Sequence, residues 1–273
     1  MYEDYWKLKT RPFRNTPDPA FFYHSGLHDE ALTKLTYAIN ENMGAAMLTG
    51  AYGCGKTLLA RILLKQLGSS KAGIMCNAQP EMTSLDLLRT ISRTTSDVEI
   101  PAARSELAAD ALLEIIEKAL TENARDGRHT VLIIDEAHMI TDVAALETTR
   151  LLLNFQEEDR FLLTVLLLGH PELADRVSGL KQLSQRIPIT CSLSHFDKDD
   201  TIAYVQRRLT VAGCKRAKLF SDDALNLVFR NSGGIPRRIN TLCDVSLAMG
   251  CAQKAEAIDA NVVLDASEKF GVN

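Results

Sequence analysis

Short apolar runs alternate with amphipathic segments over the first two-thirds of the chain. The apolar runs lie at residues 45–49, 72–76, 131–134, 161–168 and 187–191. Helical periodicity separates them at residues 58–64, 84–94, 106–124 and 144–155. Runs of this length and composition predict strands that are buried on both faces. Because they alternate with helices, we expect an α/β fold with a five-stranded parallel sheet between two helical layers.

The pattern changes after Leu193, where strand-like runs stop. Four helical segments follow, at residues 197–211, 221–231, 236–249 and 259–270. Ser221 and Asp259 are suited to cap the N-termini of two of them, and Pro236 suits a first helical position. The sequence therefore predicts a core domain over residues 1–192 and a small all-helical domain over residues 193–273.

The first predicted strand runs into a glycine-rich loop with the pattern G-x-x-x-x-G-K-[ST], and a helical segment follows. An ordinary turn is the alternative, but strand, loop and helix in succession are the context that the motif requires. In such a loop backbone N–H groups surround phosphates, Lys56 supplies positive charge and the Thr57 hydroxyl is a ligand for Mg²⁺. We therefore expect ATP and Mg²⁺ as ligands. The predicted nucleotide contacts are Gly50, Gly53, Cys54, Gly55, Lys56, Thr57 and Leu58.

Asp135 and Glu136 directly follow the third predicted strand. Open α/β sheets bind ligands at the carboxyl ends of their strands. There Asp135 is predicted to hold Mg²⁺ through its water shell, and Glu136 to orient and deprotonate the water that attacks the γ-phosphate. Two acids after a strand can also simply begin a helix. Together with the phosphate loop, they predict Mg²⁺-dependent hydrolysis of ATP to ADP and phosphate, catalysed by Glu136 and Lys56.

Composition sets the outer limits of these predictions. The chain has 273 residues, 46% of them hydrophobic, which is ample for a buried core. Its longest apolar run, residues 161–168, falls short of the ~20 residues that span a membrane. The N-terminus lacks the basic and apolar regions of a signal peptide. The six cysteines include no C-x-x-C pair, so we expect reduced thiols in the cytoplasm.

Charge leaves the question of nucleic acid open. The formal net charge of −4 argues against a surface that binds nucleic acid throughout. Residues 198–218, however, contain six basic side chains and two acidic ones. This segment is either a patch for duplex DNA or an acidic partner, or an ordinary solvated helix face and loop.

Several further motifs, taken in order, resemble a known family. They lie at residues 12–13, 16–23, 169–173, 182–187 and 233–240. With the phosphate loop and the helical end, they resemble the AAA+ ATPases, and more narrowly the ExeA/GspA-type ATPases of bacterial secretion. The resemblance runs from the first residue to about residue 270. It implies Mg·ATP between a core and a helical lid, homo-oligomers with ATP-dependent interfaces, and an unidentified protein partner in secretion or envelope assembly.

The resemblance also implies roles for three residues. Arg186 occupies the place of an arginine that reaches the γ-phosphate of a neighbouring subunit, although a structural ion pair is the competing interpretation. Arg237 matches a lid arginine that touches the phosphates, whereas its neighbour Arg238 is expected to point elsewhere. His170 stands where the family has a polar residue that senses the γ-phosphate, often Asn, Thr or Gln.

Two segments allow more than one interpretation. In the family an aromatic N-terminal arm runs beside the adenine, which implies backbone contacts from Pro12 and Phe13; an arm that seals the sheet is the alternative, and both can hold. His138 stands where these ATPases have Gln and completes a D-E-A-H string. That string imitates a helicase motif, but such helicases resemble two tandem sheet domains in a much longer chain. The six histidines show no metal-ligand spacing, so no zinc site is expected.

The same core also resembles the TnsC/TniB-type regulators of DNA transposition, which assemble on duplex DNA in the ATP state and recruit a transposase. A third class of function is a nucleotide switch that binds partners and hydrolyses slowly. All three alternatives share the predicted nucleotide site and differ in what the nucleotide controls.

Overall fold

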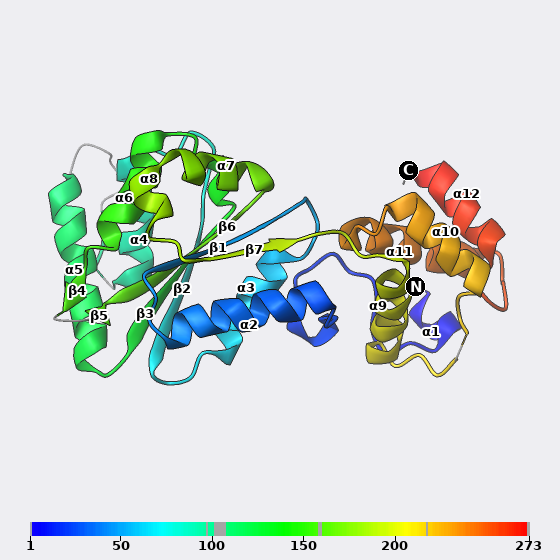
Figure 1. Cartoon of the computed structure of the whole chain (residues 1–273). Helices are drawn as coiled ribbons and strands as arrows, with labels where there is room; N and C mark the ends of the chain where they lie inside the picture. Colours follow the sequence, from blue (N-terminus) through cyan, green and yellow to red (C-terminus); the bar gives the residue numbers. More distant parts are fainter. Residues whose placement is uncertain (1, 97, 101–107, 158–159, 217, 272–273) are drawn as a thin grey trace. The chain divides into compact units, whose positions relative to one another are not determined.

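The chain divides into two units in the computed structural model, which describes residues 2–96, 98–100, 108–157, 160–216 and 218–271 (Figure 1). The sheet unit consists of residues 27–50 and 59–193. The helical unit consists of residues 1–26, 51–58 and 194–273. The glycine-rich loop therefore belongs to the helical unit, although it directly follows a strand of the sheet unit.

Five parallel strands form the sheet, in the order β2-β3-β6-β1-β7. They are β1 (Ala45–Gly50), β2 (Lys71–Asn77), β3 (His129–Asp135), β6 (Leu163–Gly169) and β7 (Ile189–Leu193). All five predicted strands are confirmed. In register, Thr49 of β1 lies opposite Gly169 of β6, and Ile134 of β3 lies opposite Leu167. The carboxyl ends of β1, β3 and β6 consequently share one edge of the sheet.

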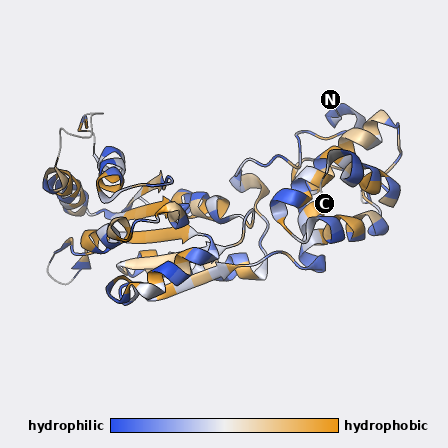
Figure 2. Ribbon diagram, turned by 90° about the horizontal axis from the view of Figure 1, so that it is seen from above, coloured by the Kyte–Doolittle hydropathy of each residue, from blue (hydrophilic) through white to orange (hydrophobic). Residues whose placement is uncertain are grey.

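Helices cover both faces of the sheet. Figure 1 shows α2 (Gly26–Asn40) and α3 (Lys56–Gln66) on one side and α7 (Pro171–Gly179) and α8 (Lys181–Ser184) on the other. The second side also carries α4 (Ser84–Thr95), α5 (Ala109–Arg125) and α6 (Val143–Leu152), whose apolar residues form one buried cluster with alternate residues of β1, β3 and β6. Figure 2 shows the strands as the most hydrophobic elements of this unit. The α/β core with a helical layer on each face is the predicted fold class.

Some elements were not predicted from the sequence or start elsewhere. Helix α2 buries Ala31, Leu35, Ala38 and Ile39, which follow helical spacing, although no element is predicted there from the sequence. The helix expected from residue 106 begins at Ala109 within the described residues, and residues 101–107 lie outside them. Short strands β4 (Gln156–Glu157) and β5 (Arg160–Phe161) pair antiparallel.

The helical unit contains the four predicted C-terminal helices, α9 (Lys198–Val211), α10 (Asp222–Ser232), α11 (Pro236–Ala252) and α12 (Ala260–Phe270). Asp197, Ser221 and Asp259 cap α9, α10 and α12 by accepting hydrogen bonds from backbone N–H groups. Pro236 is the first residue of α11. Local capping chemistry thus set these boundaries as the sequence predicted.

The aromatic arm packs with these helices. It contains α1 (Glu3–Trp6) and the 3₁₀ turn η1 (Pro19–Phe21). Trp6 is fully buried and donates from its indole nitrogen to the Leu247 carbonyl at 2.9 Å. Phe13 meets Phe220 edge-to-face, with ring centres 6.2 Å apart. The sequence predicts that the arm belongs to the domain of residues 1–192. In the structure, its large rings pack in the hydrophobic core of the helical unit instead.

Among the described residues, no helix combines the length and the apolar character that crossing a bilayer requires.

We predict that His129 makes the fold sensitive to acid. It opens β3, its Nε2 lies 2.9 Å from the Thr164 hydroxyl, and burial lowers its pKa to about 4, with the positive charges of Lys71 and Arg160 acting in the same direction. The unfolded chain therefore takes up a proton near its ordinary pKa of about 6.5 while the folded chain stays neutral. Stability is retained above that value and falls as the pH approaches 4.

Urea unfolding at about pH 7.5 and about pH 5 measures this effect. The free energy of unfolding should fall by roughly 1–2 kcal/mol more in the wild type than in His129→Asn. An equal loss in both proteins would contradict the assignment to His129.

Candidate active site

The glycine-rich loop leaves β1 at a point of close backbone approach. A Cβ atom at Gly50 would lie 2.8 Å from the Leu193 carbonyl oxygen of β7, so a larger residue there would push the two strands apart. Gly53 and Gly55 adopt φ values of 77° and 95°, which strain residues with side chains. Both the strand pairing and the loop conformation therefore require glycine at the motif positions.

Lys56 begins α3 and faces back into the loop. Its ammonium donates to the Ala51 carbonyl at 3.1 Å, and the residue is 6% exposed. Burial raises the pKa of the neighbouring Cys54 thiol, although the charge of Lys56 opposes this shift. Cys54 is thus a neutral, fully buried side chain.

Arg237 of α11 lies against this loop within the helical unit. Its guanidinium carbon is 5.1 Å from the centre of the Tyr52 ring, and a Cβ atom at Gly53 would lie 3.0 Å from the Arg237 Cβ. Gly234, with a φ of 72°, sits against the backbone of Phe196, whose N–H donates to the Gly234 carbonyl at 2.9 Å. The turn before α11 is fixed by these contacts, and Arg237 is positioned beside the loop.

Asp135 and Glu136 stand at the carboxyl edge of the sheet. Asp135 is 2% exposed and accepts a hydrogen bond from the Glu136 N–H at 2.9 Å. Glu136 has a left-handed backbone, with φ 54° and ψ 31°, which is uncommon for a residue with a side chain and typical of functional sites. The 3₁₀ turn η2 (Ala137–Met139) follows, and Arg176 of α7 holds it by donating to the carbonyls of His138 and Ile140.

His138 and His170 meet at the same edge. Their rings stack with centres 3.9 Å apart and planes within 10°. A Cβ atom at Gly169 would lie 3.0 Å from the backbone nitrogen of His138, so glycine at the end of β6 allows η2 to lie close to this strand. His138 Nδ1 is 3.3 Å from Glu136 Oε2. The spacing of the histidines in the sequence gives no sign of this pair, because adjacent strands bring together residues far apart in the sequence.

A family model described as the AAA domain matches residues 39–177. The chain belongs to this AAA family. Its sequence is also 36% identical over 276 residues to "General secretion pathway protein A" of Aeromonas hydrophila, across 100% of this chain and 49% of that protein. The chain thus spans about half the length of this relative.

Solved structures share the AAA+ fold. The ORC2 protein of Aeropyrum pernix, solved as ADPNP–ADP complexes, has a TM-score of 0.68 and 17% identity, covering 92% of this chain and 71% of that one. The ORC1 protein of the same organism in complex with DNA has a TM-score of 0.70 and 16% identity, covering 97% and 70%. At these identities the likeness shows the fold.

Arg186, Pro12 and Phe13 are predicted to contact nucleotide, and in this AAA protein each also makes a contact within the chain. Arg186 lies between α8 and β7 and donates to the Leu153 carbonyl at 3.1 Å, so it is held in its own sheet unit by one hydrogen bond. The Pro12 carbonyl accepts a hydrogen bond from Arg208, and Phe13 is 2% exposed in the helical core. The Phe13 ring therefore packs inside the helical unit. Backbone contact of Pro12 and Phe13 with a base stays a prediction.

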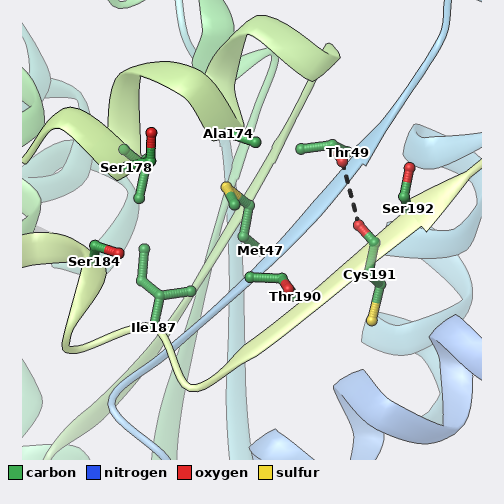
Figure 3. A pocket seen from close by; sticks show the side chains of 10 residues that line it. Met47, Thr49, Ala174, Ser178, Ser184, Ile187, Thr190, Cys191 and Ser192 are labelled. Atoms are coloured by element: carbon green, nitrogen blue, oxygen red, sulfur yellow. Dashed lines mark hydrogen bonds between the residues drawn. The ribbon is translucent and has the colours of Figure 1, made fainter.

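A hollow of about 350 Å³ lies elsewhere on the sheet unit, beside β1, β7, α7 and α8 (Figure 3). Its lining includes several hydroxyl groups, and Thr49 donates to the Cys191 carbonyl at 3.4 Å. None of the residues predicted to contact nucleotide or Mg²⁺ lines it. The hollow is therefore separate from the candidate active site.

We predict that Arg237 and Arg238 behave differently although both are exposed neighbours on α11. Arg237→Ala should weaken ATP binding roughly 10- to 100-fold, because a charged hydrogen-bond donor to phosphate is lost. Arg238→Ala, the matched control, should bind like the wild type. Titration with a fluorescent ATP analogue measures both, and equal affinities of the two variants would contradict a nucleotide role for Arg237.

Proposed function

We propose that this AAA protein binds Mg·ATP and hydrolyses it to ADP and phosphate. The observation that carries the proposal is the left-handed Glu136 directly after the buried Asp135, at the end of β3. Only β6 separates β3 from β1, the strand that leads into the glycine-rich loop. Parallel strand pairing puts the carboxyl end of β1, where the loop begins, at the same sheet edge as the carboxylate pair. This is the arrangement that phosphoryl transfer to water requires.

Each residue has a proposed role in this reaction. Backbone N–H groups of the loop bind phosphate oxygens, as does the Lys56 ammonium. The Thr57 hydroxyl and the Asp135 carboxylate are oxygen donors of the kind that Mg²⁺ prefers, Asp135 acting through a water molecule. Mg²⁺, when bound, neutralises charge on the β- and γ-phosphates. Glu136 orients the attacking water and accepts its proton, and His170 donates a hydrogen bond to the γ-phosphate or this water.

Two arginines would complete the site. Arg237 is proposed to contact the phosphates and to link the helical unit to the nucleotide state. Arg186 is proposed to reach the γ-phosphate bound by a neighbouring copy of the chain, where its planar fork matches the charge of the transition state. Homo-oligomers with ATP-dependent interfaces follow from this role.

The process that we propose is secretion or envelope assembly, in which the oligomer acts on a protein machine. Support comes from the 36% identity to the secretion pathway relative over the whole of this chain. We further propose that the protein works in the cytoplasm, supported by its six cysteines, all of which are free thiols.

Variants of Lys56 and Glu136 should separate binding from hydrolysis. Lys56→Ala should abolish ATP binding, whereas Lys65→Ala, an exposed lysine on the same helix, should not. Glu136→Gln should still bind ATP but release phosphate about 10²- to 10⁴-fold more slowly, because the proton acceptor is lost. Nucleotide titration and phosphate release measure these effects. Normal turnover in Glu136→Gln would refute the catalytic role, and normal disassembly of its oligomers would favour a nucleotide switch.

Duplex DNA is a second candidate ligand. Lys215, Arg216 and Lys218 line a hollow of about 320 Å³ beside α9 and α10. The basic segment is smaller than its sequence suggests, because Arg208 is buried and donates to the carbonyls of Pro12 and Arg14. A similar fold solved in complex with DNA adds support.

If this patch binds DNA, affinity should depend on nucleotide and on salt. Fluorescence anisotropy with duplex DNA should show binding with a slowly hydrolysed ATP analogue and not with ADP, weakened by added salt as phosphate contacts require. Lys215→Ala should reduce the salt slope by about 1, whereas Lys254→Ala, an exposed lysine of the same unit, should leave it unchanged. The absence of binding in both nucleotide states would leave the protein-machine proposal.

A further inference from the structure

Three side chains of the sheet unit converge at the end of β3 and β6. Glu136, His138 and His170 each offer one donor atom, and these atoms all lie within 4.8 Å of one another. Glu136 comes from the residue after β3, His138 from η2, and His170 from the residue that precedes α7. Glu136 and His138 are thus close in the D-E-A-H string, and the β3–β6 pairing brings His170 to them.

Two of these donor atoms are buried without a hydrogen-bond partner among the described residues. They are Glu136 Oε2 and His138 Nδ1, which lie 3.3 Å apart. Burying a carboxylate oxygen and a ring nitrogen without hydrogen bonds is costly, and a bound ion is one of the ways in which native proteins satisfy such groups. A cation bonded to both atoms would remove this cost.

The separation of the two atoms suits one small cation. In a tetrahedral zinc site, bonds of about 2.0–2.2 Å place neighbouring donor atoms about 3.3 Å apart. Glu136 and His138 have this spacing already. The third donor, on His170, must move closer, and one of the two parallel rings must tilt so that both lone pairs meet at the ion.

The donor set also selects the kind of cation. Two imidazoles and one carboxylate favour Zn²⁺ and its transition-metal neighbours, whereas Mg²⁺ prefers oxygen ligands and keeps most of its water. Three protein ligands leave a fourth position for water. The cluster therefore differs in chemistry from the oxygen donors Thr57 and Asp135.

We propose that Glu136, His138 and His170 form a binding site for a divalent transition-metal ion of the Zn²⁺ type. A bound ion occupies the Glu136 carboxylate and so withdraws it from the activation of water. The predicted inhibition rests on the proposed ATPase function. Micromolar Zn²⁺ inhibits ATP hydrolysis because it competes for the Glu136 carboxylate, whereas Mg²⁺ supports hydrolysis.

Metal binding is tested on the full chain without nucleotide. Co²⁺ replaces Zn²⁺ in such sites and absorbs in the visible region when it has four ligands. The wild type should bind one equivalent, which Zn²⁺ displaces. His138→Gln and His170→Asn should each bind at least about 10-fold more weakly, whereas His195→Ala, an exposed histidine outside the cluster, should bind normally. Circular dichroism establishes that each variant is folded.

Three results would overturn the proposal. They are the lack of visible Co²⁺ absorption in the wild type, unchanged binding in folded His138→Gln and His170→Asn, and a thiolate-to-metal absorption band, which would assign the ion to cysteines. Phosphate release, compared with and without Zn²⁺ for each protein, tests the consequence: the wild type should be inhibited and His138→Gln should resist. A wild type that releases no phosphate even with Mg·ATP alone would refute the ATPase proposal, whereas the Co²⁺ titration would still decide the metal site.

Discussion

Parallel pairing of β3, β6 and β1 is the constraint on which the candidate site depends. The pairing aligns the carboxyl ends of these strands, and each end leads into a segment of functional interest: the carboxylate pair, His170 and the glycine-rich loop. The central residues of these strands are buried and apolar, so a one-residue shift in register would move each side chain to the opposite face and disrupt its packing against the helices. The free energy of core packing thus fixes the positions of groups that take no part in that packing.

Residues at this edge adopt conformations that elsewhere would be avoided. Glu136 has a left-handed backbone, Gly53 and Gly55 have positive φ, and Gly169 allows η2 to approach β6. Asp135 is buried at the end of an apolar strand. The surrounding contacts, among them the hydrogen bonds from Arg176, compensate for this local cost. Such departures from local preference are expected where a fold holds chemical groups in fixed positions.

The helical unit is also held together by contacts between segments that are far apart in the sequence. The N-terminal arm contributes Trp6, Phe13 and Phe21 to its core, and the glycine-rich loop lies against Arg237 of α11. Arg208, which belongs to the basic segment by sequence, is used to bind the arm through two backbone carbonyls. The arm, the loop and the C-terminal helices therefore belong to one compact unit.

The elements that the sequence predicts correctly are those that depend on interactions between residues close together in the chain. Apolar runs and caps gave the five strands and the four C-terminal helices, and the G-x-x-x-x-G-K-[ST] pattern gave the loop, because side-chain periodicity, capping and glycine geometry act over a few residues. Only the tertiary structure decided which distant residues meet. The stacking of His138 on His170, the burial of Arg208 and the packing of the aromatic arm depend on contacts between segments separated by tens to hundreds of residues, for which no local pattern exists.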